Sequence, residues 1–199
     1  DAKLGDTVET KERIVANEKL ITTNVARQVA NLIPWQDRRA KMKGACLNCH
    51  NDTFVDNFYK QFDDLVTLYN EKFARPAKAI MDGLIADAVL KKNAPFEHKL
   101  QWTYYELWHH EGRRARHGAS MMGPDYTHWH GMYEVAKHFY TEFLPEVVET
   151  VAKVKPDLKA KWEQKVADLL LKDEHVWRTG LTPAEAEAIR KTAQERYNQ

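Results

Sequence analysis

Apolar side chains recur at steps of three and four residues over most of this chain, and this spacing limits the fold more than any other feature. The first run, from residue 52 onward, contains Phe54, Phe58, Phe62, Leu65 and Phe73. Such spacing puts its members on one face of a helix. Glycine and proline fall almost entirely between such runs, and no stretch alternates β-branched residues with polar ones as a strand would. The sequence therefore predicts an all-α chain, a bundle of long helices.

Glycine and proline also mark where these helices should begin and end. A kink is expected at Pro145, and Thr182 with Pro183 suits a helix start. The expected helices run from 52 into the region 76–83 or beyond, from 95 to 123, from about 125 to 155, from 157 to 177 and from 182 to 197. Residues 1–45 have weaker periodicity. We therefore predict an arm at 1–50 and a helical bundle domain at 51–199.

Length and charge narrow the classes of protein to consider. The chain has 199 residues, 30% of them charged, with a formal net charge of +1, so no basic excess favours binding to nucleic acid. No apolar run approaches the roughly 18 residues that span a bilayer, and the start lacks the pattern of a secretory signal. Because the first residue is not Met, we interpret the chain as a mature product or a piece of a longer one.

The only two cysteines lie in the stretch CLNCH, where Cys46, Cys49 and His50 form a C-x-x-C-H motif. This motif is the attachment signature of c-type haem, in which two thiols bond to the haem and the adjacent histidine binds the iron. The alternatives are a structural disulfide, a redox dithiol and half of a zinc site. Zinc would need a second Cys or His pair, and the dithiol motif normally lies in a βαβ unit. The motif therefore favours haem c, and with it a compartment outside the cytoplasm.

Eight further histidines follow the motif, although one haem uses at most two axial ligands. Six of them lie between His109 and His138. His110 and His117 share a helix face because they are seven residues apart, and Tyr126 and His130 share one at a spacing of four. Any one of these histidines alone would be interpreted as a surface or hydrogen-bonded core residue. For all of them together, that interpretation is less satisfactory.

A di-iron bundle is the competing metal site, since such proteins use Glu-x-x-His motifs that project inward from paired helices. The sequence has one, from Glu106 to His109, and a looser one from Asp125 to His128. Partner helices that would supply the remaining carboxylates are not evident. The haem motif is therefore the stronger signal.

Two longer stretches carry a resemblance to a known family. YYELWHHEGRRARHGASMMGPDYTHWHGMYEVAKHFY, preceded by CLNCHNDTFVDNFY, closely resembles the C-terminal part of the octahaem hydroxylamine oxidoreductases. The resemblance implies eight c-type haems per complete subunit, a trimer and a periplasmic location. Because this chain has one haem motif, it would be the C-terminal region of such an enzyme. The other seven motifs would then lie in sequence that precedes this chain.

The same resemblance implies roles for individual residues. Hydroxylamine would be oxidised at a special haem attached upstream, and electrons would leave through the other haems to a soluble cytochrome c. Tyr126, or as second choice Tyr133, would bond covalently to the special haem of a neighbouring subunit. Axial ligands for haems attached elsewhere would come first from His130 and His109, then from the pair His110 and His117.

A protein that only carries electrons remains the alternative, as a monohaem module in a helical bundle. About 150 residues follow the haem motif, however, and their eight histidines exceed what one haem can use. The sequence also leaves open whether the substrate is hydroxylamine or hydrazine, and whether the product is nitric oxide or nitrite.

Overall fold

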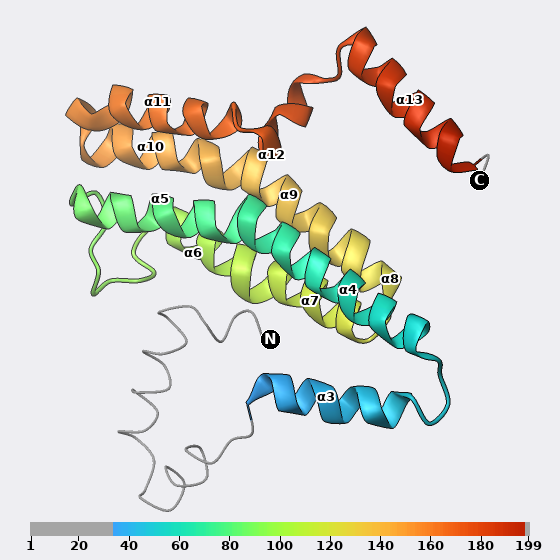
Figure 1. Ribbon diagram of the computed structural model, residues 1–199. Helices are drawn as coiled ribbons and strands as arrows, with labels where there is room; N and C mark the ends of the chain where they lie inside the picture. The colour runs from blue at the N-terminus through green and yellow to red at the C-terminus, as the bar shows by residue number, and fades with distance from the viewer. Residues whose placement is uncertain (1–33, 198–199) are drawn as a thin grey trace, which may run out of the picture. The chain divides into compact units, whose positions relative to one another are not determined.

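The computed structural model describes residues 34–197, and all regular structure in that range is helical (Figure 1). No strand occurs between residues 34 and 197, which confirms the prediction of an all-α chain. Nor is any helix in this range long and apolar enough to cross a bilayer. The chain divides into two compact units at residues 66 and 67. The proposed domain boundary at residue 50 stays a prediction, and most of the expected arm, residues 1–33, lies outside the described range.

The first unit contains a hairpin of two helices, α3 (Trp35–Cys46) and the greater part of α4 (Asp52–Tyr69). Both guanidinium Nη atoms of Arg39 donate to the Asp63 carboxylate, at 2.8 and 3.0 Å. Nearer the turn, Lys43 Nζ lies 2.6 Å from Asp56 Oδ1. Because later residues of α3 pair with earlier residues of α4, the two helices run antiparallel.

The second unit is a set of long helices in which short π-helical segments join α-helical ones. The α-helices are α5 (Arg75–Ala86), α6 (Lys99–Tyr105), α7 (Gly112–Ser120), α8 (Pro124–Thr127), α9 (Glu134–His138), α10 (Leu144–Val154), α11 (Lys159–Leu170), α12 (Asp173–Val176) and α13 (Pro183–Tyr197). The π segments are Asn70–Ala74, Glu106–Glu111, His128–Tyr133 and Phe139–Phe143, and single 3₁₀ turns cover Pro156–Leu158 and Trp177–Thr179. The helical backbone is thus continuous over 52–86, 99–120 and 124–154.

Two of the π segments end just before a proline inside a continuous helix. Asn70–Ala74 precedes Pro76, and Phe139–Phe143 precedes Pro145. A proline ring has no N–H to donate and clashes with the carbonyl four residues earlier in an α-helix. The wider π turn accommodates both effects. The helix therefore continues through Pro145. The kink expected at this residue stays a prediction.

The second long helix begins at Lys99, four residues later than its expected start at Pro95. The Gln101 side chain explains this boundary. Its Oε1 accepts a hydrogen bond from the backbone N–H of His98 at 2.9 Å, and its Nε2 donates to the carbonyl of Ala94 at 2.8 Å. Gln101 therefore satisfies backbone groups at the helix start and fixes the preceding loop to it.

One apolar core holds the long helices of the second unit together. Its largest fully buried side chains are aromatic or branched, and they come from helices far apart in the sequence: Tyr69, Leu84, Leu100, Phe139, Phe143 and Trp162. At the end of α5, Asp87 accepts hydrogen bonds from Lys161 Nζ at 2.8 Å and from Trp162 Nε1 at 2.9 Å. These bonds tie α5 to α11. By contrast, the described side chains of α13 are exposed, apart from the half-buried Ala186.

Candidate functional site

The C-x-x-C-H motif forms the turn between α3 and α4. The backbone carbonyl of Cys46, the last residue of α3, accepts hydrogen bonds from the N–H groups of Cys49 and His50, at 3.1 and 3.0 Å. Cys46 is half-buried, whereas Cys49 and His50 are exposed. The His50 ring stacks on Phe54 with centroids 4.5 Å apart. The turn therefore presents two thiols and one imidazole within five consecutive residues on an accessible surface.

This donor set suits a c-type haem. Both cysteines are unpaired thiols, which is the form that can bond to a haem side chain. Between residues 34 and 197, no group of three or more His, Cys, Asp or Glu side chains is placed to hold a metal ion by itself. A haem brings four ligands of its own and needs only one or two from the protein. The zinc and di-iron alternatives would each need more protein ligands than these residues bring together.

The remaining candidate residues lie where the second and third long helices, 99–120 and 124–154, touch almost backbone to backbone. A Cβ atom on Gly131 would come within 2.5 Å of the Cα atom of Ala115. A Cβ atom on Gly118 would lie 2.7 Å from the backbone nitrogen of Thr127. Only glycine permits such approach. The two glycines therefore let the second and third long helices approach closely at this point.

A chain of polar contacts joins His110 to His130 across these helices. His110 Nε2 lies 2.8 Å from Arg114 Nη2, and Arg114 Nη1 donates to Glu134 Oε2 at 3.2 Å. The other carboxylate oxygen of Glu134 lies 3.3 Å from His130 Nδ1, and Asp125 Oδ2 lies 3.5 Å from His130 Nε2. The structure thus brings two of the four predicted ligands into one network.

The two histidines of this network differ in the partners of their ring nitrogens. A histidine that binds metal usually donates its other ring N–H to a carboxylate or a carbonyl. His130 has a carboxylate beside each ring nitrogen, Glu134 at Nδ1 and Asp125 at Nε2. His110 has Nε2 beside the Arg114 guanidinium and Nδ1 3.7 Å from the Glu111 carboxylate. His130 Nδ1 therefore has the contact expected of a ligand, but Asp125 would have to move away before Nε2 could bind iron. His110 would have to separate from Arg114 before its Nε2 could bind iron.

The other two predicted ligands lie outside that network. His109, in the π segment Glu106–Glu111, stacks on Tyr105 with ring centroids 4.4 Å apart and touches the edge of Trp108. His117 is exposed on α7, near the end of the second long helix. Among the described residues, the four histidines therefore do not converge on one point.

Tyr126, the predicted cross-linking residue, is 58% exposed, and its ring centroid lies 5.5 Å from that of His130. It belongs to a group of exposed large side chains around the turn between α7 and α8: Met121, Met122, Tyr126, Trp129 and Tyr133, each more than half exposed. We call this group the aromatic surface. Exposed apolar patches of this kind usually mark an interaction site.

Sequence reasoning missed a buried pair that lies between the same helices. His138 Nδ1 is 2.9 Å from Glu111 Oε1, and Glu111 is almost completely buried. Within the described structure, its second oxygen, Oε2, has no hydrogen-bond partner. The two residues are 27 positions apart, so no local spacing could have identified them. His138 was among the six clustered histidines of the sequence, but no sequence feature indicated Glu111 as its partner.

A buried tyrosine lies beside this pair. The Tyr69 hydroxyl donates to the carbonyl of Leu107 at 3.3 Å, and the Arg116 guanidinium lies over its ring at 5.1 Å. Burial raises the pKa of Tyr69 to about 12, an effect that Arg116 opposes and Glu111 reinforces. The phenol therefore stays protonated at neutral pH and acts as a hydrogen-bond donor.

Comparison with protein-family models, with curated proteins and with solved structures finds no match for this chain. The functional assignment therefore depends on the residues and their arrangement.

Proposed function

We propose that this chain is the C-terminal region of a multihaem c-type oxidoreductase that oxidises hydroxylamine, with nitric oxide or nitrite as product. The observation that carries the proposal is the turn that presents Cys46, Cys49 and His50 together on the surface. A disulfide would not require the histidine, and a zinc site would require more ligands. A c-type haem uses all three side chains.

In this proposal, Cys46 and Cys49 hold the haem through thioether bonds and His50 binds its iron. When bound, the haem supplies a redox-active iron for electron transfer. The surrounding hairpin keeps the attachment turn in place because the Arg39–Asp63 and Lys43–Asp56 pairs tie α3 to α4.

Tyr126 is proposed to bond covalently to the catalytic haem of a neighbouring subunit, with Tyr133 as second choice. The exposure of the aromatic surface supports this role, because a packed core tyrosine could not reach another chain. His130 and His109, followed by the pair His110 and His117, are proposed as ligands to haems attached elsewhere. The complete protein would be a periplasmic homotrimer that passes electrons to a soluble cytochrome c.

A haem count on the intact protein tests this proposal. The pyridine haemochrome absorbance, divided by the molar concentration of complete chains, should give several haems per chain. One haem per complete chain would contradict the proposal and favour the alternative, a monohaem electron-transfer module. A protein with several haems per chain should also oxidise hydroxylamine, which is measured as the reduction of added cytochrome c.

A further inference from the structure

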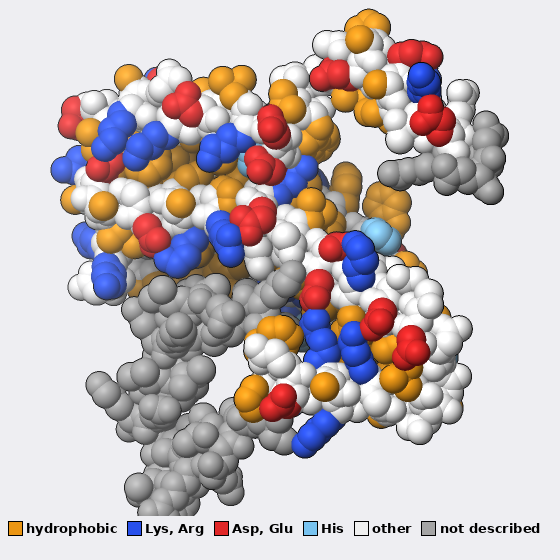
Figure 2. All heavy atoms as spheres, in the orientation of Figure 1, with side chains coloured by type: hydrophobic (Ala, Val, Ile, Leu, Met, Phe, Trp, Pro, Cys, Tyr) orange, Lys and Arg blue, Asp and Glu red, His pale blue; other side chains and the backbone are white. Residues whose placement is uncertain are grey.

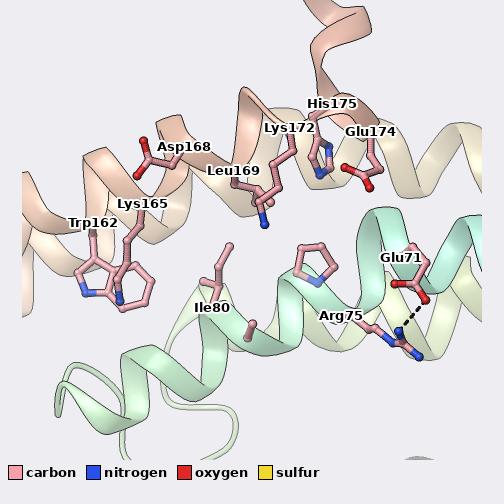
Figure 3. Close-up of a pocket in the computed structure, with 12 residues that line it drawn as sticks. Glu71, Arg75, Ile80, Trp162, Lys165, Asp168, Leu169, Lys172, Glu174 and His175 are labelled. Atoms are coloured by element: carbon pink, nitrogen blue, oxygen red, sulfur yellow. Dashed lines mark ion pairs between the residues drawn. The ribbon is translucent and has the colours of Figure 1, made fainter.

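The groove between α5 and α11–α12, about 590 Å³ in volume (Figure 3), has no excess of either charge. Three basic side chains in its lining are matched by three acidic ones: Arg75, Lys165 and Lys172 by Glu71, Asp168 and Glu174. Figure 2 likewise shows Lys and Arg interspersed with Asp and Glu on the surface over these helices. Charge therefore selects no ligand here, and the unbalanced charge of the second unit lies on α7 instead.

Arg116, on α7, is a buried arginine without an acidic partner. Only 9% of it is exposed. Its Nε donates to the carbonyl of Gly112 at 3.0 Å, and its guanidinium carbon lies 5.1 Å from the centroid of the Tyr69 ring. Its two terminal amino groups donate to no residue of the described range. Arginine is almost never so buried unless it is paired, and a buried charge without a counter-ion is costly. An anion would therefore stabilise this residue.

The terminal amino groups of Arg116 are accessible to such an anion. Among the described residues, Glu111 Oε2 is the only fully buried side-chain nitrogen or oxygen that lacks a hydrogen-bond partner. The unpartnered nitrogens of Arg116 must therefore reach the surface. Glu111 does not neutralise them, because its Oε1 lies 2.9 Å from His138 Nδ1 and no ion pair joins it to Arg116.

A second unpaired guanidinium lies beside the first. Arg113 precedes Arg116 by three residues, so the two share a face of α7. Arg113 is exposed and forms no ion pair with any residue between 34 and 197. Burial is the largest effect that lowers the pKa of Arg116; Tyr69 opposes it, and the nearby Arg113 lowers the pKa further. Both guanidinium groups stay charged at neutral pH. The pair therefore forms a small cationic site.

His117 belongs to the same helix face. It follows Arg113 by four residues, a spacing that brings side chains together on a helix. His117 is exposed, and its imidazole contacts no other side chain in the part of the chain that the structure describes. The predicted ligand His117 thus lies next to two cations that have no anion.

We propose that Arg113 and Arg116 bind a propionate carboxylate of the haem whose iron His117 ligates. This inference rests on the proposed function, in which His117 is an axial ligand of a haem attached elsewhere. Haem carries propionate carboxylates on its rim, and the planar N–H groups of a guanidinium match a carboxylate in a bidentate pair. The carboxylate would supply the negative charge that Arg116 lacks, at a largely buried position where such a pair is strong.

A spectroelectrochemical titration of the intact, haem-loaded protein tests this pairing. Arg113→Gln and Arg116→Gln each remove one cation beside the carboxylate. The reduction potential of one haem should fall, because an uncompensated propionate stabilises the ferric state, and the potentials of the other haems should stay unchanged. Arg190→Gln is the control, because Arg190 is exposed on α13 and pairs with Glu187. It should shift no haem.

Resonance Raman spectroscopy of the same variants identifies the carboxylate. The propionate bending vibration should shift in Arg113→Gln and Arg116→Gln. Arg116→Lys keeps the charge but loses the planar N–H groups, so it should shift the vibration and lower the potential less. If the potential falls without a change in this vibration, the carboxylate belongs to protein and the proposal is overturned.

Unchanged potentials in both glutamine variants would also overturn the proposal. If Arg116→Gln does not fold, the exposed Arg113→Gln decides by the same criterion. The haem content of the unaltered protein separates this inference from the proposed function. A normal haem content with unchanged potentials overturns the pairing alone, whereas a protein without haem contradicts the proposed function and the pairing with it.

Discussion

Gly112 has no side chain beyond hydrogen, and this lets the helix 99–120 pack against Tyr69 of the helix 52–86. A Cβ atom there would lie 2.6 Å from Cε2 of Tyr69 and would also collide with the Tyr69 hydroxyl. Tyr69 is held in place by its burial and by its hydrogen bond to Leu107. It cannot move aside without opening the core.

We therefore expect Gly112→Ala to lower the free energy of unfolding by about 1–3 kcal/mol, the usual cost of overpacking. Gly44→Ala is the matched control, because Gly44 also lies in a helix and a Cβ atom there meets nothing within 4 Å. The control should gain about 0.5–1 kcal/mol from helix propensity. Urea unfolding measures the free energy of unfolding of each variant. Equal stability of the two would show that the Tyr69 side chain moves aside at little cost.

Tyr126 is the residue that would join this chain to the catalytic haem. Tyr126→Phe keeps the ring and removes only the hydroxyl. Helix content and the spectra of the other haems should stay as they are. The absorption of the cross-linked haem and hydroxylamine oxidation should both be lost. If the absorption and the oxidation both persist in Tyr126→Phe, Tyr133→Phe is the next variant to test. If neither variant loses them, the proposed cross-link does not come from this region.

Among the elements, α5 and α11 are joined by Asp87. The hydrogen bond from Lys161 is the largest effect that holds the pKa of Asp87 below its ordinary value of 3.8, and the bond from Trp162 adds to it. Because the pKa is lower in the folded state, the stabilising contribution is present above about pH 4. It is lost as the pH falls through the folded-state pKa.

The variant Asp87→Asn should therefore melt below the wild type at pH 7, and the gap should narrow as the pH falls to 3 or lower. Differential scanning calorimetry over this range measures the gap. Asp82→Asn on the same helix is the control, because the ion pair of Asp82 with Lys78 is exposed. If the difference in melting temperature between the wild type and Asp87→Asn does not change with pH, the effect of the substitution comes from packing and not from charge.

The elements were more predictable from the sequence than the contacts between them. Apolar spacing predicted the long helices, and the four-residue spacing of Tyr126 and His130 does place their rings side by side. The π segments were not predicted, because a single extra residue in a turn leaves no mark in apolar periodicity. The Glu111–His138 pair was not predicted either, because it depends on how two helices are aligned. Such alignment is set by close contacts such as those of Gly118 and Gly131.

For the whole molecule, the aromatic surface bears on assembly. Met121, Trp129 and Tyr133 are too exposed to stabilise the bundle of one chain, and their burial against another chain would remove apolar area from water. We expect the intact protein to sediment as a trimer at micromolar concentration. Charged replacements in this group, such as Trp129→Glu, should dissociate it. A monomer in the unaltered protein would contradict a tyrosine donated between subunits.

The proposed function depends on haem that is covalently attached through Cys46 and Cys49, and mass spectrometry of a tryptic digest detects such attachment. Cleavage after Lys43 and Lys60 releases one peptide, residues 44–60, that contains the whole motif. We predict that this peptide carries the mass of one haem and absorbs in the Soret region. Recovery of the same peptide from the native protein with two unmodified thiols, or with a disulfide between them, would contradict it.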